Sequence, residues 1–232
     1  MKTQTTTAMP DLSTLSALER WRRGLKALAT VIADPEQTDQ VLVFSAYVNG
    51  ANAERMDRFF ADPNGQRLYA EHRTIDSHTV NLDALAQLPD GTLGREYARF
   101  LQSRGFTPDV FEGAPEGVTD PRASYVVQRL RQTHDLWHVM TGSETDPASE
   151  VALQAFTYAQ VGAPSALILT IAGTLRAFRY KPAIVRDVVA MYRTGREAEK
   201  LAVFPWEDHW ATPLTELRAM LALPLAPHAA AA

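Results

Sequence analysis

The chain has 232 residues, of which 46% are hydrophobic and 22% are charged, and this composition and length suit one globular domain with a substantial core. The net charge of −4 offers no basic field for nucleic-acid phosphates, so nucleic acid is excluded as an expected partner. The absence of cysteine excludes disulfides, thiolate metal sites and cysteine nucleophiles, so any metal must be held by nitrogen and oxygen ligands.

The N-terminal region predicts a disordered tail over residues 1–12, followed by a helix over residues 14–33. In that helix, apolar residues such as Leu18, Trp21 and Leu25 recur at spacings of three and four. The tail has neither the apolar core of a secretory signal nor the arginines of a transit peptide. The longest apolar stretch, residues 163–172, is about half of the ~20 residues that a membrane-spanning helix needs.

The remaining chain predicts further helices joined by turns. Residues 37–48 fit a helix or a buried strand, and their length favours a helix. Residues 62–65 (Asp-Pro-Asn-Gly) predict a turn, residues 66–81 an irregular segment, and residues 106–121 the one long loop. Helices are expected over residues 52–60, 92–103, 122–140, 146–161, 165–180, 181–201 and 212–223. The fold class is therefore all-α: a single-domain bundle of about eight to ten helices over residues 13–223, with a disordered tail at 224–232.

Four residues in the middle of the chain predict a metal site. His134 and His138 stand four apart, so their imidazoles lie on one face of a helix. Asp135 projects beside them, to bind the metal or to orient an imidazole. Glu150 lies in the first turns of the next helix, which Asp146 and Pro147 begin, and an antiparallel return would bring its carboxylate to the histidine face.

This ligand set suits a divalent ion. Two neutral imidazoles with one or two carboxylates favour Zn(II), Fe(II), Co(II) or Mn(II) over Mg(II). Such an ion polarises a carbonyl or carboxylate, activates water, or binds dioxygen if it is iron. Two histidines at this spacing, without other candidate ligands nearby, more often cap a helix or face solvent. The nearby Asp135 and Glu150 favour the metal site over that interpretation.

The same segment resembles the Coq4 family of ubiquinone biosynthesis, as a bacterial member. The resemblance rests on His134, Asp135, His138 and, after eleven residues, Glu150. It extends to residues 88–94 (Leu-Pro-Asp-Gly-Thr-Leu-Gly), Tyr97, residues 100–101 (Phe-Leu), 125–131 (Tyr-Val-Val-Gln-Arg-Leu-Arg) and 206–210 (Trp-Glu-Asp-His-Trp), in the family's order. These blocks cover roughly residues 88–223.

The resemblance implies a helical protein that uses His134, Asp135, His138 and Glu150 as catalytic metal ligands. The implied reaction is oxidative decarboxylation at ring carbon one of a polyprenylated 4-hydroxybenzoate-type precursor, which replaces the carboxylate by a hydroxyl. The implied partners are this prenylated precursor, other quinone-biosynthesis enzymes and a membrane surface, with homo-oligomers also expected. The implied location is cytoplasmic, peripheral on the inner face of a bacterial membrane.

Two alternatives stay open at this stage. One is a lipid-binding scaffold that organises the biosynthetic enzymes and uses its metal structurally. The other is an HD-type phosphohydrolase, which would need His72 or His78 and Asp187 at the same site and would leave Glu150 without a role.

Smaller expectations concern the surroundings of the site. Arg129 and Arg131 are candidates to pair with an anionic group, although helix arginines are more often solvated or paired structurally. Residues 166–173, with the preceding helix, offer apolar walls and small residues for a prenyl tail, although a hydrophobic helix is more often core.

Overall fold

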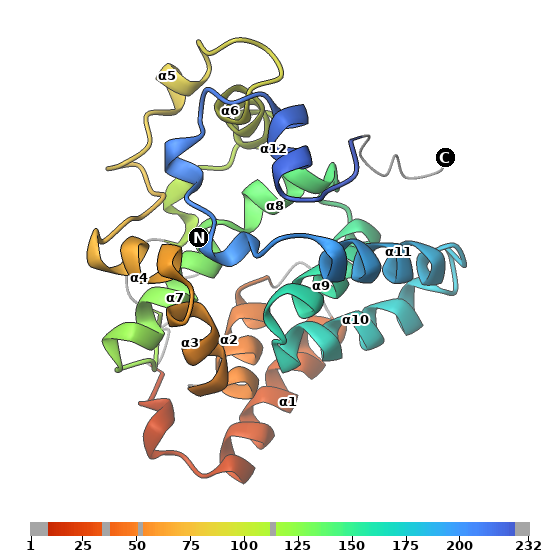
Figure 1. Ribbon diagram of the computed structural model, residues 1–232. Helices are drawn as coiled ribbons and strands as arrows, with labels where there is room; N and C mark the ends of the chain where they lie inside the picture. The colour runs from red at the N-terminus through yellow and green to blue at the C-terminus, as the bar shows by residue number, and fades with distance from the viewer. Residues whose placement is uncertain (1–8, 34–37, 51–52, 112–114, 226–232) are drawn as a thin grey trace.

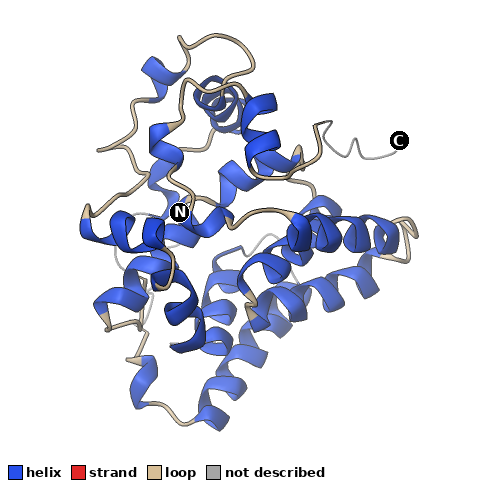
Figure 2. Ribbon diagram, in the orientation of Figure 1, coloured by secondary structure: helices blue, strands red, loops and turns tan. Residues whose placement is uncertain are grey.

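The computed structural model describes residues 9–33, 38–50, 53–111 and 115–225. Figure 2 shows helices and loops throughout these ranges, where the only β-type pairing is an isolated bridge between Thr92 and Pro213. The helices, labelled in Figure 1, are α1 (Ala17–Ala33), α2 (Thr38–Asn49), α3 (Ala53–Phe60), α4 (Pro63–Ala70), α5 (Leu82–Leu85), α6 (Leu93–Arg104), α7 (Pro121–Gln132), α8 (His134–Thr141), α9 (Pro147–Val161), α10 (Pro164–Ala177), α11 (Ile184–Glu197) and α12 (Leu214–Met220). Short 3₁₀ turns lie at Leu12–Thr14, Pro108–Phe111, Leu201–Val203 and Trp206–Asp208.

The all-α prediction is confirmed, and its differences in detail have local causes. Residues 62–65 begin α4, because the Asp62 side chain accepts from the amide of Asn64 and Pro63 takes the first helical position. Residues 66–70 are therefore helical rather than irregular. The helix expected over residues 122–140 is two helices, α7 and α8, which meet at Thr133. None of the described helices is both long and apolar enough to cross a membrane.

The predicted tails lie mostly outside the described residues. At the inner edge of the N-terminal tail, however, Leu12 is buried and its amide donates to the Gly117 carbonyl. Residue 12, at the end of the predicted tail, therefore packs against the rest of the fold. This contact also ties the long loop, residues 106–121, to the start of the chain; residues 112–114 of that loop lie outside the described ranges.

The main core joins α6, α8, α9, α11 and the C-terminal segment. Its large buried members include Trp137 on α8, Phe156 on α9 and Trp206, with the rings of Trp137 and Phe156 5.8 Å apart. Gly195 of α11 allows a close approach to α9, because a Cβ there would lie 2.9 Å from the Phe156 carbonyl oxygen. Helices α8 and α9, which carry the predicted ligands, therefore lie in the packed centre of the fold (Figure 1).

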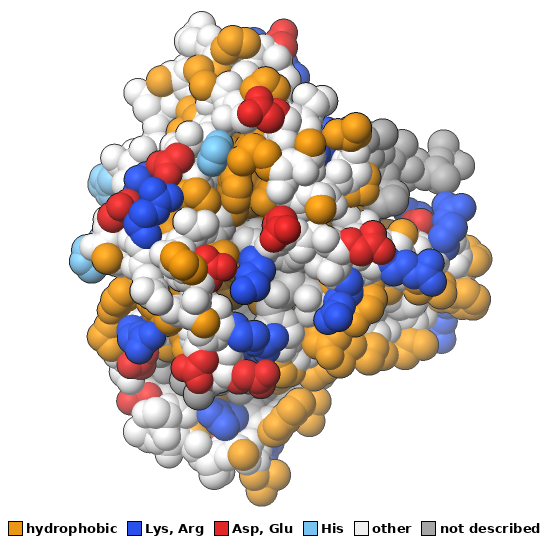
Figure 3. Space-filling model, viewed as in Figure 1, with side chains coloured by type: hydrophobic (Ala, Val, Ile, Leu, Met, Phe, Trp, Pro, Cys, Tyr) orange, Lys and Arg blue, Asp and Glu red, His pale blue; other side chains and the backbone are white. Residues whose placement is uncertain are grey.

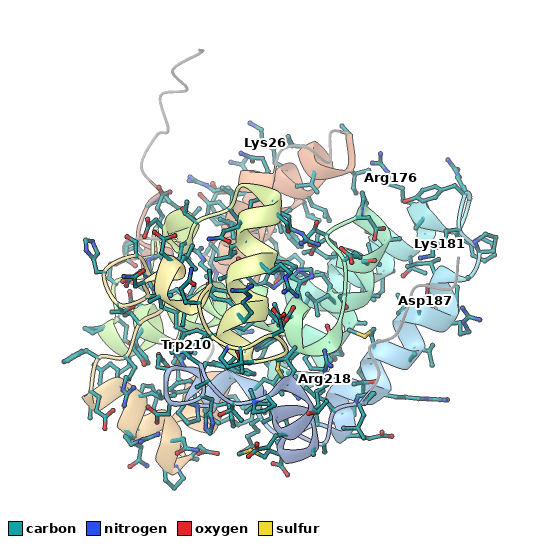
Figure 4. The ribbon with its side chains drawn as sticks, turned by 90° about the horizontal axis from the view of Figure 1, so that it is seen from above. Lys26, Arg176, Lys181, Asp187, Trp210 and Arg218 are labelled. Carbon is teal, nitrogen blue, oxygen red and sulfur yellow. The ribbon has the colours of Figure 1, made fainter. Side chains whose placement is uncertain are left out.

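The C-terminal segment holds α8 in place. Arg218 of α12 is 8% exposed and donates to the carbonyls of Val139 and Met140, which lie in the last turn of α8. Figure 4 labels Arg218 and Trp210 in this segment. A guanidinium at this end satisfies carbonyls without helical partners and complements the helix dipole. Arg218, which lies near the C-terminus, thus helps to hold α8 and its two histidines in place.

Candidate metal centre

The two histidines of α8 point the same way, as their spacing predicts. The Nε2 atoms of His134 and His138 lie 3.3 Å apart, and the rings are nearly perpendicular with centroids 4.9 Å apart. His138 is buried, whereas the His134 side chain is 26% exposed. One ligand is therefore fixed in the core and the other lies at the opening to solvent.

Glu150 joins them because the chain turns back directly after α8. Gly142 ends α8 at φ 70°, in the left-handed region that favours glycine. Asp146 then caps α9 by accepting from the amides of Ala148 and Ser149. This turn places Glu150 Oε1 3.2 Å from His138 Nε2 and Glu150 Oε2 3.7 Å from His134 Nε2. The prediction that Glu150 returns to the histidine face is confirmed.

The spacing of the donor atoms is compatible with a first-row divalent ion. Ligand bonds of about 2.0–2.1 Å at tetrahedral angles separate neighbouring donor atoms by about 3.3–3.4 Å. The two Nε2 atoms, 3.3 Å apart, and His138 Nε2 with Glu150 Oε1, 3.2 Å apart, lie close to that value, while the other oxygen of Glu150, Oε2, lies 3.7 Å from His134 Nε2. With one donor atom from each residue, all three lie within 4.8 Å of one another. Two imidazole nitrogens and one carboxylate would leave a fourth position for water or substrate, as in catalytic metal sites.

Contacts behind His138 fix its ring for metal binding. Its Nδ1 lies 3.1 Å from the Ser143 carbonyl oxygen, and this nitrogen must donate because a carbonyl only accepts. In its neutral form His138 therefore carries its proton on Nδ1 and presents the lone pair of Nε2 to a metal ion, whereas Nε2 donates to Glu150 only when the ring is protonated. Phe100 of α6 stacks on the same ring with centroids 5.4 Å apart. The ligand orientation is set before any ion binds.

The electrostatic interactions among Glu150, His134 and His138 favour a negative carboxylate beside positive charge at the histidines. Burial alone would raise the pKa of Glu150, but hydrogen bonds and charge from His134 and His138 lower it to about 2. Burial alone would lower the pKa of His134, but its hydrogen bond and charge interaction with Glu150 raise it. Glu150 is therefore ionised at neutral pH and stabilises positive charge at the histidines, whether that charge is a proton or a metal ion.

Asp135 lies beside the ligands rather than among them. The group whose donor atoms all fall within 4.8 Å of one another consists of His134, His138 and Glu150. Burial raises the pKa of Asp135, while the nearby His134, His138 and Arg104 act to lower it. Its carboxyl is therefore close enough to feel the site, and its predicted role as a ligand stays a prediction.

Helix α6 supplies neighbours that the motif alone did not identify as part of the site. Tyr97, Phe100 and Arg104 share one face of α6 at helical spacing. Tyr97 is 1% exposed, and burial together with the charge of Asp135 raises the pKa of its hydroxyl. The Arg104 guanidinium lies over the Phe100 ring at 4.0 Å and pairs with Glu144 in the turn between α8 and α9. The signal in the sequence was this spacing, but nothing there placed α6 against α8.

The other candidate residues have structural partners elsewhere. Arg129 is buried and pairs with Glu207, so it is not free for a ligand. Asp187 pairs with Lys181, and His72 and His78 do not join the ligand cluster. The constellation of an HD-type phosphohydrolase is therefore absent from the described residues.

Part of the prenyl slot expected at residues 166–173 is occupied, because Gly173, the smallest residue there, faces Val151 of α9. A Cβ on Gly173 would lie 2.2 Å from Cγ2 of Val151, so α9 already fills that space. Phe156, expected to form one wall, is fully buried in the core. For Arg131, burial lowers the pKa, and Glu116 is the charged group that acts on it.

Comparison with known proteins gives one family. The family model described as coenzyme Q (ubiquinone) biosynthesis protein Coq4 matches residues 10–227. The chain is 31% identical over 190 residues to the mitochondrial ubiquinone biosynthesis protein COQ4 of Coprinopsis cinerea, covering 81% of this chain and 65% of that protein. It is 30% identical to the mitochondrial COQ4 homolog of Xenopus laevis, covering 90% of this chain and 74% of that protein. The chain thus spans about two thirds to three quarters of these relatives.

The fold comparison agrees. A crystal structure described as that of a ubiquinone biosynthesis protein from Nostoc punctiforme matches with a TM-score of 0.71 at 31% identity, over 86% of this chain and 96% of that one. The family model covers nearly the whole chain, and the similar structure shows the same helical fold. The chain therefore belongs to the Coq4 family.

Proposed function

We propose that this protein takes part in ubiquinone biosynthesis and catalyses the metal-dependent oxidative decarboxylation of a polyprenylated 4-hydroxybenzoate-type precursor. The observation that carries the proposal is the convergence of His134 Nε2, His138 Nε2 and the Glu150 carboxylate within 4.8 Å. The names of the relatives, which are ubiquinone biosynthesis proteins, support the pathway. The reaction type rests on the family resemblance and on the chemistry of the site.

A divalent ion held by these three residues would supply a positive charge for the carboxylate or ring oxygen of the substrate. Zn(II), Fe(II), Co(II) and Mn(II) all suit the donor set. Glu150 contributes a fixed negative charge and His138 a fixed lone pair. Because the ring of His138 is held by the Ser143 carbonyl and by Phe100, binding requires little reorganisation of this ligand.

Two neighbouring groups are suited to move or hold a proton. Asp135 has a raised pKa because it is buried, and a carboxyl of this kind near a metal site is a candidate acid or base. The raised pKa of the Tyr97 hydroxyl keeps it protonated, so it remains a hydrogen-bond donor. We assign Asp135 the role of exchanging a proton with the ring hydroxyl of the substrate. We assign Tyr97 the role of keeping the Asp135 side chain in position.

The overall reaction is a two-electron oxidation of the ring. The bond between ring carbon one and the carboxylate carbon breaks, carbon dioxide leaves, and a new bond forms at the same ring position to an oxygen atom from water. An external oxidant must accept the two electrons; dioxygen is the oxidant we expect, and with the two protons released it would become hydrogen peroxide. The residues of the site bind, orient and exchange protons, and none of them supplies the electrons.

The test is to purify the variants Glu150→Ala and Glu54→Ala and to express each of them in cells from which the gene for this protein has been deleted. Glu54 lies on α3 with its side chain 78% exposed and serves as the matched control. We expect Glu150→Ala to fold, to lose its metal and to accumulate the carboxylated precursor, while Glu54→Ala restores quinone synthesis. If Glu150→Ala loses metal yet restores normal quinone synthesis, the catalytic proposal fails and a scaffold role that does not need the metal replaces it.

A further inference from the structure

Arg104, the last residue of α6, reaches the metal centre through an aromatic ring. Its guanidinium carbon lies 4.0 Å from the centroid of the Phe100 ring. Phe100 in turn stacks on His138, with ring centroids 5.4 Å apart and ring planes that differ by 27°. A cation that lies over an aromatic ring is attracted to it and limits the movement of that ring. Arg104 is therefore linked to a proposed metal ligand through one side chain.

The same guanidinium donates to the turn between α8 and α9. Its Nη2 donates to Glu144 Oε2 at 2.5 Å, and its Nε donates to Thr145 Oγ1 at 3.2 Å. These two residues directly follow Ser143, whose carbonyl oxygen lies 3.1 Å from His138 Nδ1. Arg104 therefore also ties α6 to the short segment that orients the His138 ring.

Most ion pairs at a protein surface are solvated contacts of little consequence. Figure 3 shows acidic and basic side chains next to one another over much of the visible face, and such pairs contribute little to stability. Arg104 differs because its side chain is only 22% exposed and its third nitrogen, Nη1, donates to the Phe100 carbonyl at 3.3 Å and to Ser103 Oγ at 3.1 Å. Every nitrogen of the guanidinium thus has an acceptor in the protein, which favours a structural link over a site for a substrate anion.

We propose that Arg104 is a positioning residue for His138, a role that rests on the proposed metal site. It keeps Phe100 against the imidazole, and it keeps residues 143–145 where the Ser143 carbonyl accepts the Nδ1 proton. A neutral imidazole must carry its proton on Nδ1 if Nε2 is to offer a lone pair to a metal ion. By holding that acceptor in place, Arg104 selects the tautomer of His138 that binds metal.

The sign of the effect on metal affinity separates positioning from charge. A cation near the site repels a divalent ion, so loss of the Arg104 charge alone would strengthen metal binding. Loss of positioning weakens metal binding, because the imidazole must then leave other orientations and the other tautomer before it can bind. The two roles therefore predict opposite results for the same substitution.

The first measurement is the Co(II) dissociation constant of the full chain, obtained from the visible spectrum during titration. We expect Arg104→Ala to raise this constant about tenfold, as loss of a contact behind a metal ligand does. Arg99→Ala is the matched control, because Arg99 lies on the same helix with its side chain 54% exposed and pairs with Asp90 and Glu96. This control should bind Co(II) as the wild type does.

The second measurement needs no metal and reports the tautomer directly. In the metal-free protein, at a pH high enough to leave the ring neutral, nitrogen NMR distinguishes a protonated Nδ1 of His138 from a protonated Nε2. We expect the Nδ1–H tautomer in the wild type and in Arg99→Ala, and a mixture of both tautomers in Arg104→Ala. Loss of a contact that served stability alone would lower the melting temperature without changing the tautomer.

Arg104→Lys separates the charge of the side chain from its shape. A lysine still pairs with Glu144, but it lacks the planar group that lies over Phe100 and donates to Thr145 at the same time. We expect its Co(II) dissociation constant to lie about threefold above that of the wild type, between the wild type and Arg104→Ala.

Two results would each overturn the proposal. One is an Arg104→Ala variant that binds Co(II) as tightly as the wild type or more tightly, and the other is a variant that keeps the Nδ1–H tautomer of His138. If Arg104→Ala does not fold, the same two criteria apply to Arg104→Lys. If the wild type itself binds no Co(II), the metal site fails, while the tautomer in the metal-free protein still decides whether Arg104 positions the ring.

Discussion

The buried pair between Arg129 and Glu207 joins α7, directly before the helix α8 that carries His134 and His138, to the C-terminal segment. The Arg129 side chain is 0% exposed and the Glu207 side chain 11%. The guanidinium contacts both carboxylate oxygens, at 2.5 and 2.9 Å, and donates to the Phe204 carbonyl at 3.1 Å. Arg129→Met removes the donors and leaves a nearly buried carboxylate without its partner.

The expected cost follows from that burial. Removing one partner of a buried ion pair costs about 3–5 kcal/mol, because the remaining charge is desolvated and uncompensated. For a chain of this length each kcal/mol lowers the melting temperature by about 2–4 °C, so we expect a loss of roughly 10 °C. The control is Arg129→Met with Glu207→Leu, which removes both charges. That double variant should recover all but about 1–3 kcal/mol, the cost of the unsatisfied Phe204 carbonyl.

The assay is urea unfolding followed by helical circular dichroism, with the free energy of unfolding extrapolated to water. The single variant should be less stable than the double variant. A single variant within about 1 kcal/mol of the wild type, or a double variant less stable than the single one, would refute the reasoning. In either case the pair would not be acting as a buried, desolvated interaction.

Three further perturbations test the neighbourhood of the metal centre. Gly173→Ala should destabilise the fold by about 1–3 kcal/mol, because its Cβ would meet Cγ2 of Val151 at 2.2 Å, and Val151→Ala in the same chain should restore most of the loss. Asp146→Ala should cost about 1 kcal/mol and Asp146→Asn much less, since the side chain caps α9 through the amides of Ala148 and Ser149; equal losses would contradict a capping role. Metal affinity, measured by calorimetry, should fall as the pH is lowered, because the raised pKa of His134 means that a proton competes with the ion. An affinity that is flat between pH 5 and pH 8 would contradict this competition. In the metal-free protein the same raised pKa gives the pair of His134 with Glu150 a stabilising effect that is present below pH 6.5 and is lost as pH rises through the folded pKa. The lowered pKa of Glu150 makes its share of that effect disappear as pH falls from 4.5 toward 2.

Much of this architecture was predictable because it depends on local spacing. The helix that begins at Asp146 and Pro147 follows from capping chemistry, and the shared face of His134 and His138 follows from helical periodicity. The return of Glu150 to that face followed from a short turn between two helices. These features involve residues close in sequence, so the sequence alone contains their cause.

Other features depended on contacts between distant segments. Thr133 interrupts the expected long helix, while Arg129 beside it is paired with Glu207, 78 residues away. The stacking of Phe100 on His138 and the capping of α8 by Arg218 also join separate helices. The α4 helix was missed for a different reason: an Asp-Pro pair suits both a turn and a helix start, and only the residues that follow decide between them.

We propose that His134, His138 and Glu150 hold one divalent ion. The most direct measurement is the metal content of the purified protein together with the visible spectrum after titration with Co(II), for the wild type, His138→Ala and Glu54→Ala. We expect one ion per chain and a tetrahedral Co(II) spectrum in the wild type and in Glu54→Ala, and neither in a folded His138→Ala. Full metal content in His138→Ala, or no stoichiometric binding in the wild type, would contradict it.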